Sequence, residues 1–314
     1  MKSTIKTTSK RRAYTIIELL TVMSIIVILS SMLVPAMNKV RQFAQKVKQN
    51  AQFHSIGVAL ELFQAETEKV PDSSAFDPGS TIDIYCGAEK LAEAMMGQDL
   101  LGFHPDSVFR RSGWRDMPPD IAPPNKDLYP KPNTAVPAEY IKYKENLKAR
   151  IGPFLPLENA NIYPLTEIYN NNILTTNGFI AKDADGENYA NYVLCDVYTR
   201  VTNNVTGQKI GMPILYYKAD TSKNSHYTGD VAGVNNPGYD NSDNIYNYVD
   251  NDALVRLGMP WAPGFDHPMS TVVSGQTTTG GVPTPAMFYQ NIRNKKISAS
   301  SRPNRADTYI LLSA

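Results

Sequence analysis

The sequence has few cysteines. Among its 314 residues only Cys86 and Cys195 are cysteine, and they are too few and too far apart for a CxxC metal site. If the chain is exported to an oxidising compartment, the two thiols can form one disulfide, which we predict on that condition. Two separate buried thiols are the alternative, and the residues alone leave both open.

The sequence also lacks the motifs of common catalytic sites. Its four histidines are scattered without an HExxH pair, and it has neither a GxSxG turn nor the glycine pattern of a P-loop. The runs DADGEN (183–188) and GYDNSDNIYNYVDND (238–252) offer oxygen ligands, but their spacing favours a turn and a solvated loop over a calcium site. We therefore predict no catalytic residue, no metal ligand and no cofactor, and interpret the protein as a non-enzyme.

Acidic residues are absent from the first thirteen residues, which contain five of the 31 Lys and Arg residues. The rest of the chain has four more acidic than basic side chains. Such a mildly acidic body gives no general reason to expect nucleic acid as a partner. The cluster RNKKISASSRPNR (293–305) is basic, and we interpret it as a solvated loop.

The N-terminal region contains a hydrophobic run of membrane length. As a helix, YTIIELLTVMSIIVILSSMLV (14–34) would span roughly 31 Å, which is the thickness of a bilayer core. The basic residues before it predict that the N-terminus stays cytoplasmic and that the rest of the chain is exported. A secretory signal peptide is the competing interpretation, but no clear small-x-small cleavage site follows the run.

One residue in this run, Glu18, does not suit a plain membrane anchor. An unpaired carboxylate in a lipid-facing helix costs about 2–3 kcal/mol or more, and such a residue is by default functional. Glu18 would therefore need a partner. Alternatively, it lies near enough to the cytoplasmic edge to reach the headgroups, or it is protonated.

The residues around Glu18 resemble the N-terminus of type IV pilin and type II secretion pseudopilin precursors. The shared pattern is a basic leader, a small residue, an aromatic residue and then Thr-Ile-Ile-Glu-Leu-Leu before an apolar helix. The resemblance implies that a prepilin peptidase cuts between Ala13 and Tyr14 and methylates the new N-terminus. It also implies that Glu18 meets the free amino group at Tyr14 of a neighbouring subunit in a filament. Ala13 and Tyr14 depart from the Gly and Phe that the family favours there.

The helix is expected to continue past the membrane. Pro35 matches the kinking proline of the family, although it could instead break the helix at the membrane exit. Pro71 in EKVPDSS is expected to end the helix. Between these prolines an apolar stripe recurs at helical spacing, with Phe43 beside it, and we predict that it packs on the following domain. The stripe comprises Val40, Ala44, Val47, Ala51, Val58, Leu62 and Ala65.

The remainder of the chain predicts an irregular part followed by strands. Proline-rich turns such as MPPDIAPPNKDLYPKPN interrupt the irregular part, where helical fragments are expected at 89–96 and 138–150. The segments at 189–201 and 211–220 predict a hairpin, and RADTYILLSA (305–314) predicts another strand. The expected fold class is α+β, with a long N-terminal helix packed on a small antiparallel sheet and a large irregular insertion.

These observations predict the organisation of the whole chain. Relatives usually continue past the last strand into an acidic loop that can hold calcium, so we expect the C-terminus to be truncated and assign no calcium site. The predicted parts are a basic leader (1–13), the transmembrane half of the helix (14–37), its amphipathic periplasmic half (38–70), the irregular insertion (71–188) and a β head (189–314).

By resemblance, the protein is a structural subunit of a membrane-anchored filament, with one pass through the inner membrane and a periplasmic head. The implied partners are the prepilin peptidase, the N-terminal helices of other pilin-like subunits, an inner-membrane assembly platform and membrane lipid. A pseudopilin of a type II secretion system is favoured. The alternatives are a type IV pilin for adhesion or DNA uptake, and a membrane-anchored periplasmic enzyme or glycan-binding module.

Overall fold

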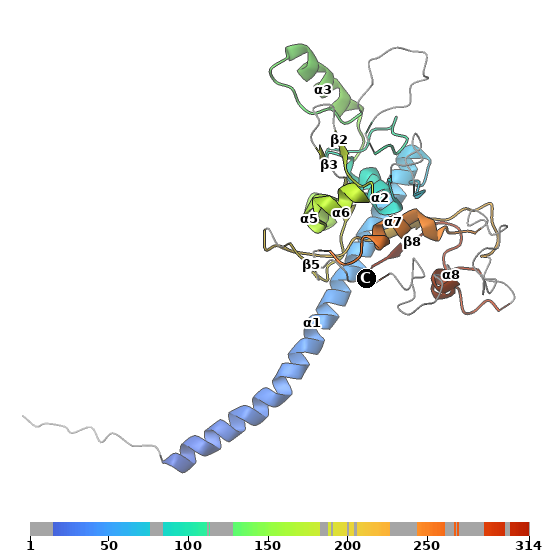
Figure 1. Cartoon of the computed structure of the whole chain (residues 1–314). Helices are drawn as coiled ribbons and strands as arrows, with labels where there is room; N and C mark the ends of the chain where they lie inside the picture. The colour runs from blue at the N-terminus through green and yellow to red at the C-terminus, as the bar shows by residue number, and fades with distance from the viewer. Residues whose placement is uncertain are drawn as a thin grey trace, which may run out of the picture. The chain divides into compact units, whose positions relative to one another are not determined.

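The chain divides into two compact units, residues 1–48 and residues 49–314. The boundary falls within the long helix α1 (Ile16–Thr67), drawn in blue in Figure 1. The computed structural model describes residues 15–75, 84–111, 113, 128–182, 188–189, 191–199, 201–203, 206–226, 244–260, 267, 269, 286–298 and 302–313.

The described part of the first unit consists of α1 and the residue before it. None of residues 15–48 is buried, and apolar side chains such as Ile25 and Leu29 are 57% and 62% exposed. Within the described residues, α1 is the helix that is long and apolar enough to cross a membrane. Pro35 lies inside α1, so it does not break the helix at the membrane exit.

In the second unit, α1 buries a face that its apolar pattern does not predict. The predicted stripe is wrong, because every member from Val40 to Ala65 is exposed. Two glutamines belong to the buried face because backbone groups of a neighbouring segment bond to them. Gln52 Nε2 donates to the Cys195 carbonyl oxygen at 2.8 Å, and Val197 N donates to Gln49 Oε1 at 2.9 Å. The buried residues are Gln49, Gln52, Ile56, Ala59, Leu60 and Phe63.

The region 71–188 contributes a helix to the core. Helix α2 (Gly87–Met96) is buried along its whole length and packs against strands β4 (Tyr192–Leu194) and β7 (Leu215–Lys218). Helix α3 (Pro137–Ala149) has no buried residue. Both predicted helical fragments are thus confirmed, but the core position of α2 does not fit a mere surface insertion. Most of the proline-rich run lies outside the described residues.

The other helices are short. They are α4 (Leu157–Ala160), α5 (Leu165–Ile168), α6 (Asn171–Thr176), the 3-10 helix η2 (Tyr248–Asn251), α7 (Asp252–Arg256) and α8 (Ala286–Ile292).

The described strands form two-stranded antiparallel sheets. Their pairs are β1 (Ile162–Pro164) with β4, β2 (Ala181–Lys182) with β3 (Asn188–Tyr189), β5 (Val201–Thr202) with β6 (Lys209–Ile210), and β7 with β8 (Tyr309–Leu312).

The predicted hairpin of 189–201 with 211–220 forms only in part. A bridge joins Cys195 to Pro213, and β5 pairs with β6 beside it. However, β4 pairs with β1, and β7 pairs with β8, in a register that runs from Leu215↔Leu312 to Lys218↔Tyr309. Strands β4 and β7 therefore form their longer pairs with β1 and β8, and not with each other.

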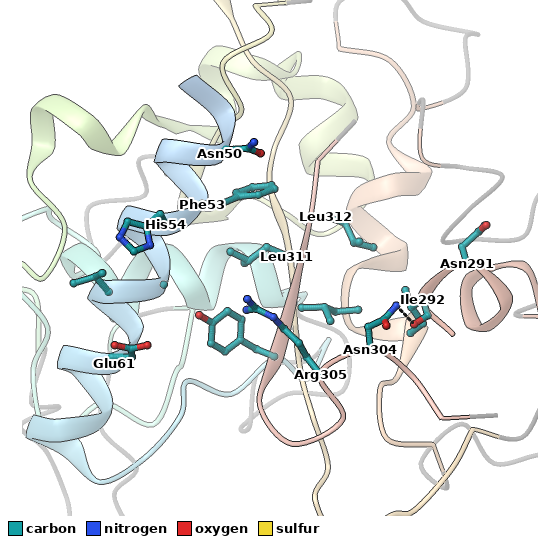
Figure 2. Close-up of a pocket in the computed structure, with 14 residues that line it drawn as sticks. Asn50, Phe53, His54, Glu61, Asn291, Ile292, Asn304, Arg305, Leu311 and Leu312 are labelled. Carbon is teal, nitrogen blue, oxygen red and sulfur yellow. Dashed lines mark hydrogen bonds between the residues drawn. The ribbon is translucent and has the colours of Figure 1, made fainter. Parts of the chain in front are cut away.

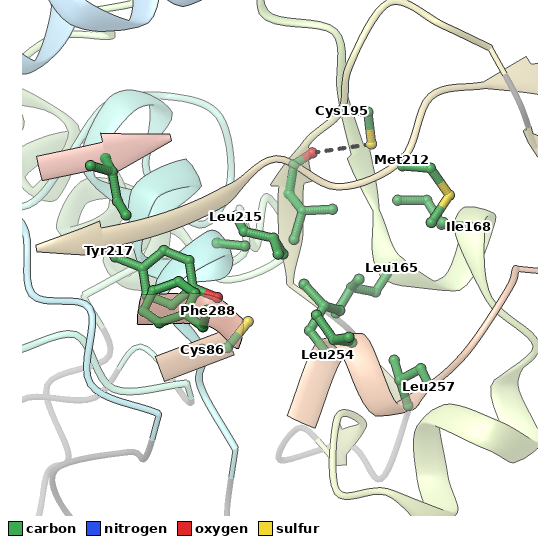
Figure 3. Close-up of a cluster of buried hydrophobic side chains, with 14 of the residues drawn as sticks. Cys86, Leu165, Ile168, Cys195, Met212, Leu215, Tyr217, Leu254, Leu257 and Phe288 are labelled. Carbon is green, nitrogen blue, oxygen red and sulfur yellow. Dashed lines mark hydrogen bonds between the residues drawn. The ribbon is translucent and has the colours of Figure 1, made fainter. Parts of the chain in front are cut away.

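Strand β7 separates two hydrophobic clusters. Tyr216 faces the cluster that contains Phe63 of α1, and the Phe63 ring makes an edge contact with Phe103 at 4.9 Å between centroids. Leu215 and Tyr217 belong to the second cluster, shown in Figure 3 with Phe288 of α8. Successive side chains point to opposite faces of a strand, so three consecutive residues of β7 contribute to both clusters. The structure thus has a long apolar N-terminal helix and several small antiparallel sheets, consistent with the predicted α+β fold class, but the single sheet that was predicted is divided into two-stranded pairs.

Candidate functional site

The site suggested by the sequence begins where α1 begins. Glu18 lies in the first turn, and its Oε2 accepts hydrogen bonds from Thr15 N at 2.9 Å and from Thr15 Oγ1 at 3.1 Å. Glu18 N in turn donates to Thr15 Oγ1 at 3.2 Å. This reciprocal pattern is a capping box, in which a threonine and a glutamate three residues later satisfy backbone donors at a helix start.

The sequence analysis missed Thr15 as the local partner of Glu18. The signal was present, because Thr-x-x-Glu directly before an apolar run is the sequence pattern of a capping box. The carboxylate is therefore not without contacts in the single chain. Among the described residues, both of these hydrogen bonds come from the neutral Thr15, which does not neutralise the negative charge.

The surroundings of Glu18 are apolar and uncovered. Ile17 and Leu20 are 75% and 62% exposed. Exposure of apolar side chains continues after Pro35, at Val40, Phe43 and Val47. A bilayer core accommodates about 20 helical residues, so the apolar surface of α1 is longer than a membrane span alone requires.

The predicted processing site cannot be placed beside these residues. Ala13 and Tyr14 lie outside the described residues, so cleavage between them remains a prediction. Of the predicted assembly residues, Glu18 and Pro35 are both in α1, at its first turn and in its interior.

The two cysteines do not form the expected disulfide in the structure. Both thiols are free and buried. Cys86 precedes the first residue of α2, whereas Cys195 follows β4, and Figure 3 shows the two in different parts of the same cluster. Burial raises the pKa of both thiols well above the ordinary value, which keeps them protonated and unreactive.

The second unit, residues 49–314, is called the head from here on, and it contains a cluster of buried charged groups around Lys90. The Lys90 side chain is fully buried and forms an ion pair with Asp72 at 2.7 Å. Lys90 also donates to Ser74 Oγ at 2.6 Å, and Ser73 Oγ donates to Asp250. These contacts join the segment after α1 to α2 and η2, so they hold the end of α1 in place.

The carboxyl groups of this cluster have shifted pKa values. Burial raises the pKa of Asp250 to about 8. Burial alone would also raise the pKa of Asp72, but the Lys90 ammonium and several hydrogen bonds hold it below its ordinary value. Asp72 can thus accept a proton and Asp250 can donate one. Both side chains, however, belong to a packed junction between elements, and we interpret them as structural.

A second buried carboxylate, Glu93, is enclosed by donors. It accepts hydrogen bonds from the Tyr129 hydroxyl at 3.0 Å, Gln98 Nε2 at 3.1 Å, the Ser107 hydroxyl and the Tyr85 hydroxyl. Burial raises the pKa of Glu93 despite these bonds. With its lone pairs occupied by the protein, Glu93 is a structural acceptor and not a base directed at a substrate.

The candidate cation loops do not assemble into a site in the described part of the chain. No group of three or more His, Cys, Asp or Glu residues there is placed to hold a metal ion. Of the two acidic runs, residues 183–187 and 238–243 lie outside the described residues. Asp252 is described, and it forms an ion pair with Arg256 at 2.6 Å on its own helix.

Comparisons with protein-family models, with curated proteins and with solved structures gave no match to the chain. Any functional conclusion therefore rests on the residues and geometry of α1 and of the head.

Proposed function

We propose that the protein is a pilin-like structural subunit, anchored in a membrane by α1, whose function is assembly into a filament. One observation carries the proposal: the apolar surface of α1 stays uncovered from Ile16 to Val47, well beyond a membrane span, and it contains the carboxylate of Glu18. Lipid can cover the first part of this surface. The rest requires a protein partner with a similar apolar helix.

The part of α1 in the head supports the same interpretation. Ile56, Leu60 and Phe63 are buried on one face, while Val58 and Leu62 on another face are 43% and 50% exposed. One face thus holds the globular head, and another stays available to neighbours. A helix that served only as an anchor would need no apolar face outside both the membrane and its own core.

Glu18 can make the contact between neighbouring subunits specific. A carboxylate in an apolar environment is costly unless an opposite charge pairs with it. If a prepilin peptidase cleaves before Tyr14, the new amino group provides such a charge, and the Thr15 backbone amide of the capping box is kept. We infer that Glu18 of one subunit pairs with this amino group of the next, so that adding a subunit neutralises both charges.

Within the family, we propose a pseudopilin of a type II secretion system, in the inner membrane with a periplasmic head. The residues that favour it are the EKVP sequence at the end of α1 and the GMPILYY sequence that contains β7. The implied partners are other pilin-like subunits, the prepilin peptidase and the assembly platform.

The experiment compares three variants of the capping box, co-expressed with the peptidase and the assembly machinery. Glu18→Gln keeps a side-chain acceptor for Thr15 N but loses the charge, whereas Thr15→Val loses the hydroxyl but keeps the charge. Glu18→Leu removes both charge and acceptor. Immunoblots of the sheared surface fraction and of the membrane fraction measure assembly and insertion.

We expect both Glu18 variants to insert and accumulate in the membrane but to yield no sheared filament, because the partner charge is lost. Thr15→Val should still assemble, since the cap is worth only about 1 kcal/mol. If Glu18→Gln assembles like the parent, the charge has no role in assembly. If the parent and all three variants accumulate equally in the membrane and none yields sheared filament, α1 is a plain anchor, as in an anchored enzyme or binding module.

A further inference from the structure

A groove of about 650 Å³ lies in the head beside β8. Figure 2 shows α1 on one side of it, with Asn50, Phe53, His54 and Glu61, and Asn291 and Ile292 of α8 on the other side. Strand β8 lies between the two walls, and all four of its residues line the groove. Because the lining comes from both faces of the β7–β8 sheet, the groove follows the edge of β8.

This edge of β8 has backbone hydrogen-bonding groups without a partner among the described residues. In an antiparallel pair, residues alternate between those that bond to the partner strand and those whose backbone groups point the other way. Ala219 N donates to Thr308 O at 2.9 Å, so the register places Ile310 and Leu312 in bonded pairs with β7. The N–H and C=O groups of Tyr309 and Leu311 therefore point away from β7, along the groove.

The walls are held by contacts of their own. Asn304 N and Asn304 Nδ2 donate to the Ile292 carbonyl oxygen at 2.9 and 3.2 Å, which fixes the wall beside α8. On the other wall, Gly57 lets α1 approach β8, since a Cβ at this residue would lie 3.2 Å from the Tyr309 hydroxyl oxygen. The groove is thus formed before any partner binds, which reduces the entropic cost of binding.

The charges around the groove favour one kind of partner. Arg305 lines it, and the basic loop that includes Arg293, Lys295 and Lys296 begins directly after Ile292. The acidic groups nearby are Glu61 on α1 and Asp307, which forms an ion pair with Arg302 at 3.1 Å. Basic side chains are in excess here, although the chain after its first thirteen residues has more acids than bases.

We propose that this groove binds an extended, acidic segment of a partner protein, which adds to β8 as a further antiparallel or parallel strand. Main-chain bonds to Tyr309 and Leu311 would supply affinity, as in other cases of strand addition. Alternate side chains of the segment point to opposite faces. Apolar ones would contact Phe53 and Val58, and acidic ones would face Arg305 and the basic loop. The proposal does not depend on filament assembly.

The test uses the full chain in detergent micelles and short fluorescein-labelled peptides, with binding measured by fluorescence anisotropy. One peptide alternates Val and Glu, and its control alternates Val and Lys. Two further Val-Glu peptides carry N-methyl groups, one on every Val amide and the other on every Glu amide. A labelled oligothymidine represents nucleic acid.

The Val-Glu peptide should bind at least about tenfold more tightly than the Val-Lys peptide. Only alternate amides of an added strand face β8, so one of the N-methylated peptides should bind like the parent and the other should not bind. Arg305→Glu should weaken binding of the Val-Glu peptide by about tenfold, whereas the same charge change at exposed Lys142 of α3 should not alter it.

Equal binding of the two N-methylated peptides, or loss of binding in both, would overturn strand addition. Equal affinity for the Val-Glu and Val-Lys peptides, or tighter binding of oligothymidine, would overturn the assignment of an acidic protein segment. Absence of Val-Glu binding to the parent chain would also reject the proposal, because the groove would then be closed to a partner strand.

Discussion

Helix α1 has two parts whose side chains lie in different environments. None of its described residues before Gln49 is buried, although most are apolar, whereas Ile56 and Phe63 in the head are at most 1% exposed. The first part can lower its free energy only by contact with lipid or another protein. The second part obtains its contacts from the same chain. Substitutions in the first part should therefore change assembly, and substitutions in the second should change folding.

The largest effect is expected from a test of this difference that makes the same substitution, Phe to Ala, once in each part of α1. Phe63→Ala removes a ring packed between Phe103 and Phe154, and it should lower the free energy of unfolding of the head by about 3–5 kcal/mol. Phe43→Ala removes a ring that is 69% exposed, so head stability should not change. Urea denaturation followed by circular dichroism measures both. A loss of stability in Phe43→Ala comparable to that in Phe63→Ala would remove the distinction.

A smaller effect is expected when the ion pair between the buried Lys90 and the partly exposed Asp72 is broken. Lys90→Met keeps most of the side-chain volume but removes the cation beside Asp72, and it should cost about 2–3 kcal/mol. The same substitution at Lys142 of α3, an exposed residue, should stay within about 0.5 kcal/mol. Urea midpoints of the two variants provide the comparison, and equal midpoints would show that the pair is not needed for folding.

The stability of the head should also depend on pH, because the head contains a buried carboxyl group. Asp250 has a pKa of about 8 when folded, against an ordinary value of 3.8, because of burial. The folded state keeps a proton that the unfolded chain releases, so this group makes the free energy of unfolding fall as pH rises from about 4 to about 8. Asp250→Asn cannot titrate.

Relative to the parent, Asp250→Asn should therefore gain stability with rising pH, by roughly 1 kcal/mol per pH unit within this window. Urea titrations of both proteins at several pH values measure the difference. Buried histidines such as His226, whose pKa burial lowers to about 4, affect both proteins equally and cancel in the comparison. A difference that does not change with pH would contradict the burial of an uncharged Asp250.

The smallest expected effect concerns thiol chemistry. Cys86 and Cys195 are buried, and burial raises the pKa of both, so neither should react with iodoacetamide in the native protein. Both should react in urea without a reductant, because no disulfide joins them. A cysteine introduced by Val40→Cys, at a residue that is 62% exposed, should react at once in detergent. Mass spectrometry of the products separates the three sites.

Several elements of the structure follow from local sequence. The apolar run and the Thr-x-x-Glu pattern together place the start of α1, since both capping and membrane length depend on neighbouring residues. Helices α2 and α3 appear where they are predicted. Strands β7 and β8 lie inside the segments 211–220 and 305–314, which were predicted to be strands. Each of these signals lies within one continuous segment of the sequence.

The choice of contacts was decided by the tertiary structure. Sequence periodicity selects the most apolar face of α1, but the buried face includes Gln49 and Gln52, because they bond to backbone groups at Val197 and Cys195. Similarly, β7 pairs with β8 across a long stretch of chain rather than with the nearer strand. A backbone group is satisfied by whichever partner the fold brings close, and that partner can lie far away in the sequence. The sequence by itself predicted helices α1, α2 and α3, strand segments that contain β7 and β8, and an apolar run long enough to cross a membrane, whereas the tertiary structure decided which of their faces and edges are covered.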